Sequence, residues 1–62
     1  MTSEEKLNKA IINIQNALNN LEMGEERQLR LAIGDMNYAI DNLVKAKAFA
    51  TIAIEDAENN YK

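Results

Sequence analysis

The sequence predicts an all-α fold, an antiparallel hairpin of a short and a long helix in a single domain, residues 1–62. Proline is absent, and only two glycines occur. Ala, Leu, Ile, Glu and Lys, which favour helix, are abundant, and the apolar residues recur at gaps of four and three, the period of one helix face. Because so short a chain hides only about 60% of its unfolded surface, we expect the hairpin to assemble into a helical bundle as a homo-oligomer.

The first helix is expected over residues 3–23. It begins at a capping box, in which the Thr2 hydroxyl accepts from the Glu5 amide and the Glu5 carboxylate reaches back to Thr2. Gly24 follows the last apolar residue of the helix, where a left-handed glycine commonly ends a helix. We therefore predict a turn at residues 23–25. The apolar stripe of this helix consists of Leu7, Ile11, Ile14, Leu18 and Leu21.

The second helix is expected over residues 25–60, and the same four-three spacing continues through it. The spacing keeps its phase across Gly34, which favours a helical, exposed glycine that costs about 1 kcal/mol relative to alanine; a kink is the alternative. Lys47 stands where a hydrophobe is expected. Either its stem packs while the ammonium reaches water, or a charged core residue here fixes register or oligomer state. The stripe consists of Leu29, Ile33, Met36, Ile40, Leu43, Lys47, Ala50, Ile54, Ala57 and Tyr61.

Folding the chain at Gly24 brings the two stripes into register along the hairpin. Leu21 then matches Leu29, Ile14 matches Met36, and further apolar pairs continue to the open end. Because antiparallel neighbours pair in this way, we predict that the two stripes form the contact between the helices.

Alanines recur beside the stripes at one heptad position of both helices. Small side chains allow a further helix to approach closely, so we interpret this flank as a docking face. The alternative is that alanine, the best helix former, fills positions where nothing else is required. The alanines are Ala10, Ala17, Ala32, Ala39, Ala46 and Ala53.

The second helix is predicted to be much longer than the first, with about 36 residues against 21, or roughly 54 Å against 30 Å. The part beyond Ala48 has no internal cover, although it is apolar on two sides. Exposed apolar surface of this kind marks an interface or an aggregation site. We therefore expect an oligomer or partner interface at Ala32, Ala39, Ala46, Phe49, Ala50, Ile52, Ala53, Ile54, Ala57 and Tyr61.

Two further features are candidates for contact with a partner. Tyr38 is an aromatic side chain on the back of the second helix, and aromatic residues often anchor interfaces. Glu55, Asp56 and Glu58 form an acidic cluster at the end of the helix where the macrodipole favours cations. This cluster could meet a basic partner, or it could be a solvated face that promotes solubility.

The composition excludes several function classes. Without cysteine or histidine, the chain lacks disulfides, thiolate nucleophiles, imidazole bases and the common zinc ligands. We therefore expect no enzyme activity, no metal and no cofactor. The net charge of −3 argues against nucleic-acid binding. No apolar run is long enough to cross a bilayer, and the acidic start differs from a secretory signal, so a cytoplasmic location is expected, in the host if the chain is phage-encoded.

These observations favour a small protein-binding helical module, most simply a dimer that forms a four-helix bundle. Because Asn, Ile and Lys are frequent, as in AT-rich genomes, the module is expected to be a phage or mobile-element inhibitor that occludes a host protein. The alternative is a structural or assembly subunit of a larger complex. A third possibility is a nucleic-acid regulator, since the size and plan are similar to those of plasmid Rop-type RNA-binding hairpins; the resemblance is architectural and carries no residue motif.

Overall fold

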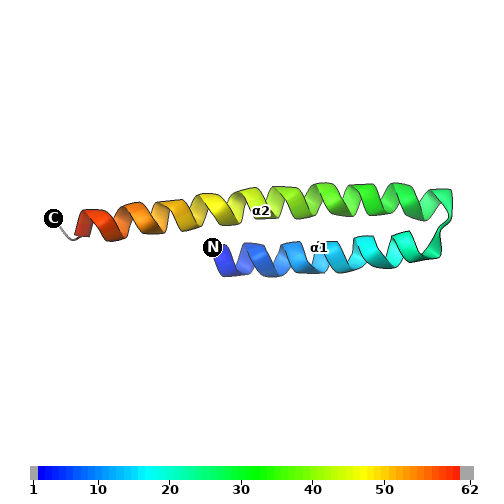
Figure 1. Ribbon diagram of the computed structural model, residues 1–62, viewed down its shortest axis with the longest axis horizontal. Helices are drawn as coiled ribbons and strands as arrows, with labels where there is room; N and C mark the ends of the chain where they lie inside the picture. Colours follow the sequence, from blue (N-terminus) through cyan, green and yellow to red (C-terminus); the bar gives the residue numbers. More distant parts are fainter. Residues whose placement is uncertain (1, 61–62) are drawn as a thin grey trace.

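The computed structural model describes residues 2–60, which form two antiparallel helices (Figure 1). Helix α1 spans Ser3–Met23 and helix α2 spans Glu26–Asn60. The hairpin is elongated, with Cα extents of 56 × 14 × 13 Å. The predicted two-helix hairpin is confirmed, and neither described helix contains a stretch apolar enough to cross a membrane.

Both ends of α1 follow from its sequence. At the N-terminus, the Thr2 hydroxyl accepts a hydrogen bond from the Glu5 amide at 3.2 Å, which satisfies one of the amides that a helix leaves free at its start. At the C-terminus, Gly24 adopts a left-handed conformation with φ of +73°, and its amide donates to the Leu21 carbonyl at 3.2 Å. Only glycine takes this conformation at little cost, so it sets the position of the turn.

Helix α2 continues through Gly34 without a break. The prediction of a helical glycine is confirmed, although Gly34 is half-buried instead of exposed. A Cβ atom added at this position would meet no neighbouring atom within 4 Å. The glycine is therefore not required by packing in the hairpin.

The two helices meet through small side chains. Five alanines are at most 5% exposed, and they are the only apolar side chains that are buried in the described part of the chain. Because alanine projects a single methyl group, two helices that meet at alanines can approach closely. We call this contact the alanine seam, which consists of Ala10, Ala17, Ala32, Ala39 and Ala46.

The prediction that the large apolar residues form the contact between the helices is wrong. These side chains remain 37–58% exposed. Each comes one residue after a seam alanine or after another buried or half-buried residue on the same side of its helix, and one residue turns a side chain about 100° around the helix. Because the helices are antiparallel, this rotation carries both stripes to the same side of the hairpin. We call this side the apolar face, which consists of Leu7, Ile11, Ile14, Leu18, Leu21, Leu29, Ile33, Met36, Ile40 and Leu43.

The prediction that the alanine flank docks a further helix also needs correction. The helix that covers Ala32, Ala39 and Ala46 is the chain's own α1, which leaves at most 4% of each residue exposed. Ala53 continues the same spacing but is exposed, because α1 has ended before that level. Figure 1 shows α2 projecting well beyond the start of α1.

Polar side chains alternate with the alanines along the seam. The amide of Asn42 donates to the Asn13 side-chain oxygen at 2.8 Å, and the amide of Asn20 donates to the Asp35 carboxylate at 2.9 Å. All four side chains are half-buried. These two hydrogen bonds link the helices at positions seven residues apart on each, and they therefore favour one register of the hairpin.

The open end of the seam is polar as well. The Ser3 hydroxyl donates to the Ala46 carbonyl at 2.9 Å, and Lys6 is buried, with 8% of its surface exposed. These polar side chains lie outside the apolar four-three spacing from which the helix contact was predicted. The signal that was available is that Asn13 and Asn20 each lie three residues after a seam alanine, on the buried side of α1.

Candidate interaction surface

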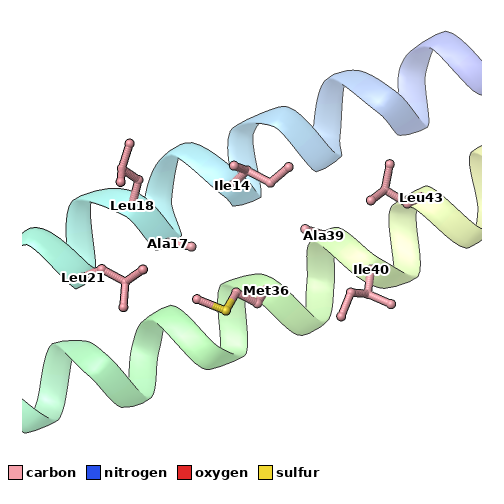
Figure 2. A pocket seen from close by; sticks show the side chains of 8 residues that line it. All are labelled: Ile14, Ala17, Leu18, Leu21, Met36, Ala39, Ile40 and Leu43. Carbon is pink, nitrogen blue, oxygen red and sulfur yellow. The ribbon is translucent and has the colours of Figure 1, made fainter.

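A groove runs along the apolar face between the two helices. It has a volume of about 480 Å³. Figure 2 shows Ala17 and Ala39 pointing toward one another from opposite helices, with larger aliphatic side chains around them. The groove thus has alanines at its base and aliphatic walls. It is lined by Ile14, Ala17, Leu18, Leu21, Met36, Ala39, Ile40 and Leu43.

The lining limits what the groove can bind. All eight lining residues are apolar, whereas small-molecule sites usually include a few polar groups that orient the ligand. Ile14 and Met36, which the sequence pairs across the hairpin, both line the groove. The surface is therefore suited to apolar packing and has no side chain for chemistry.

The part of α2 from Ala48 onward continues this surface as a single helix. We call residues 48–60 the extension. Phe49 is half-buried and every later described residue is exposed, including Ile52 and Ile54. By their spacing, Ala50, Ile54 and Ala57 lie on the same side of α2 as the apolar face. Tyr61, the last predicted interface residue, lies outside the described residues.

The other predicted partner-facing residues lie apart from the groove. Tyr38 is 67% exposed and follows Met36 by two residues, which turns it about 200° around the helix to the opposite side. Glu55, Asp56 and Glu58 are all exposed on the extension. Among the described residues, no acidic side chains gather in a group that could hold a metal ion.

Charged residues border the apolar face on α2. Near the turn, Arg30 forms an ion pair with Glu26 at 2.9 Å, and both side chains are largely exposed, so the pair contributes only about 0.3–0.5 kcal/mol. At the open end, Lys47 is exposed, as expected if its ammonium reaches water. The idea that Lys47 fixes register or oligomer state stays a prediction.

Among the described residues, one buried side-chain polar atom lacks a hydrogen-bond partner. Gln28 lies near the turn, four residues before Ala32, and its side-chain oxygen is buried without a hydrogen bond from any described residue. Such an atom costs about 1–3 kcal/mol. Hydrogen bonding of the buried polar groups is therefore less complete at the end of the seam near the turn than at its middle.

Comparison with protein-family models, with curated protein sequences and with solved structures finds no match to this chain.

Proposed function

We propose that the chain is a protein-binding helical module and that the apolar face, continued by the extension, is the surface through which it binds. The observation that supports this most is that ten Leu, Ile and Met side chains lie on one side of the hairpin with 37–58% of each exposed. Fully burying such a side chain contributes about 1.5–3 kcal/mol, so covering the remaining surface of ten would contribute on the order of 10 kcal/mol per chain, before the cost of association.

The groove favours a helix as the occupant. Its walls offer no hydrogen-bond donor or acceptor from a side chain. An extended peptide would bury backbone groups there without partners, whereas a helix satisfies these groups internally. A third or fourth helix packed along the groove completes a helical bundle, the arrangement in which amphipathic helices bury their apolar stripes.

The proposed action requires no catalysis. A module of this kind acts by covering an apolar surface of its target or by joining two chains. The exposed acidic residues of the extension keep that surface soluble when it is not bound.

Site-specific photo-crosslinking in the cells that encode the chain tests this proposal. A photoreactive amino acid is placed at Ile14, on the apolar face, or at Asn16, which lies two residues later on the other side of α1. We expect a discrete crosslinked protein product from Ile14 and little from Asn16. Equal products from both positions, or none from Ile14, would contradict the proposal.

A further inference from the structure

We infer that a second copy of the chain covers the apolar face, and that α2 of one copy pairs with α2 of the other, antiparallel and over its whole length. This inference rests on the proposed function and names the occupant of the same surface. In a symmetric pair of this kind, residue 43, at the middle of the helix Glu26–Asn60, lies opposite itself.

The apolar side of α2 is complementary to itself in this register. Leu43 meets Leu43 of the other copy at the two-fold axis, and large residues meet small ones on either side. Met36 lies opposite Ala50, and Leu29 lies opposite Ala57. Such alternation of large and small side chains allows two helices to interdigitate. Ile33 and Ile54 also meet, and Lys47 falls at the level of Ile40 with its ammonium free to reach the edge.

The extension has a defined place in this arrangement. In the alternative pairing, only the two-helix parts of the hairpins, where α1 is present, would lie opposite each other. The 13 residues of each extension would then remain an uncovered helix of about 20 Å. When the pair is centred on residue 43, each extension lies over the half of the other copy's groove that is nearer the turn. This arrangement explains why the apolar stripe of α2 continues past the end of α1.

The charges favour the antiparallel direction. The extension carries the acidic cluster Glu55, Asp56 and Glu58, whereas Arg27 and Arg30 lie near the turn. In the antiparallel pair, the acidic cluster of each copy lies at the same height along the helix axis as the two arginines of the other copy. Because the pair is symmetric, this arrangement occurs at both ends. A parallel pair would place the two acidic clusters together. Acidic residues also occur near the turn and repel the cluster. The attraction is therefore confined to the outer edge of α2, where Glu58 and Arg30 occupy equivalent heptad positions.

The available area matches that of a stable dimer. A face two helices wide and about 30 Å long, continued by about 20 Å of single helix, offers roughly 800 Å². Specific interfaces bury about 800 Å² per partner, which is close to one sixth of the 4991 Å² surface of the hairpin. A second copy therefore provides enough cover without any further protein.

Spin-label distances in the full chain test the register. The chain has no cysteine of its own, so Asn37→Cys, Val44→Cys and Thr51→Cys each introduce one labelling position at the outer edge of α2. Centred on residue 43, the two labels of a dimer are offset along the axis by about 3 Å at position 44, 18 Å at position 37 and 24 Å at position 51. We expect light scattering to give twice the mass of one chain and the shortest distance to occur at position 44.

Three results would overturn the inference. A monomer at millimolar concentration excludes the second copy, equal distances at all three positions indicate a parallel pair, and a shortest distance at position 37 indicates the alternative pairing of only the two-helix parts. Each of these results leaves the proposed function intact if the crosslink from Ile14 still forms. Loss of that crosslink together with a confirmed dimer centred on residue 43 would show the dimer to be an artefact of purification, and would end the proposed function as well.

Discussion

The alanine seam and the apolar face lie side by side on the same two helices and differ in the size of their side chains. Five small residues are buried in the seam, whereas ten large ones remain about half exposed on the face. The seam brings the helices together but removes little apolar surface from water, because each alanine contributes one methyl group. Most of the hydrophobic driving force of the chain therefore remains available for association.

The two regions also differ in the kind of contact that determines how their residues pair. In the seam, hydrogen bonds from Asn20 to Asp35 and from Asn42 to Asn13 accompany the alanines, so a shift of register would break directional contacts. The face has only apolar contacts to offer, which depend on shape and area. Substitutions in the seam should therefore act on folding of the single chain, and substitutions on the face should act on association.

The largest effect is expected from Ala32→Leu in the seam. Ala32 has no exposed surface, and adding large side chains to a filled site costs typically 1–3 kcal/mol, so we expect a loss of about 3 kcal/mol because two backbones must separate. Urea unfolding measures this loss. The control is Ala48→Leu, the same change at an exposed position of α2 outside both the seam and the apolar face, which should lower stability far less. Equal losses for both would show that the seam is not the contact between the helices.

Ile33→Glu on the apolar face should have the next largest effect. Ile33 is 58% exposed in the hairpin, so the single chain should tolerate the change within about 0.5 kcal/mol. If the face is covered by a second copy, the change should cost about 2 kcal/mol or more at high protein concentration, because a charge is then buried opposite Ile54 without a partner. Thermal unfolding at two concentrations distinguishes these cases. A loss independent of concentration would mean that Ile33 supports the hairpin itself.

The hydrogen bond from Asn20 to Asp35 should contribute about 1 kcal/mol. Asn20→Ala, Asp35→Ala and the double variant form a cycle that isolates the coupling between the two side chains. Asn19→Ala serves as the control, since Asn19 is exposed and makes no contact in the seam. A coupling near zero would indicate that these side chains face water in solution.

Gly34→Ala should give the smallest change, a gain of about 0.5–1 kcal/mol. The gain is expected because α2 is helical at this position and a Cβ there meets nothing within 4 Å. Thermal unfolding followed by circular dichroism measures it. Lower stability in the alanine variant would indicate that a neighbouring chain approaches the backbone at Gly34.

The sequence predicted the helices and their ends but not which residues lie between them. Thr2, Gly24 and the four-three spacing are local signals, and local signals determine where a helix begins, ends and is amphipathic. Two stripes one residue apart both fit an antiparallel hairpin, and spacing alone does not distinguish them. Hydrophobicity favoured the leucine and isoleucine stripe as the contact between the helices. The contact in the structure is the alanine stripe, because alanine permits close approach and the asparagines form hydrogen bonds across it.

The candidate surface was predicted in part. The extension was recognised from the unequal helix lengths, because the rise per residue is constant. The groove was not predicted, because its position depends on which residues lie between the two helices. Once Ala17 and Ala39 face one another, Ile14 and Ile40 are displaced to the walls of the groove. Side-chain size at the contact decides this, and no single-residue scale of hydrophobicity contains that information.

The turn between the helices has a wider consequence. Only Gly24 and Glu25 separate α1 from α2, and the reversal of the chain depends on one left-handed residue. If that residue took ordinary helical angles, the chain would become a continuous rod, and its two halves would have to exchange partners with those of another molecule. A change in the backbone angles of this one residue would therefore permit domain swapping. Gly24→Val should favour the swapped form, which small-angle scattering would detect as a longer particle.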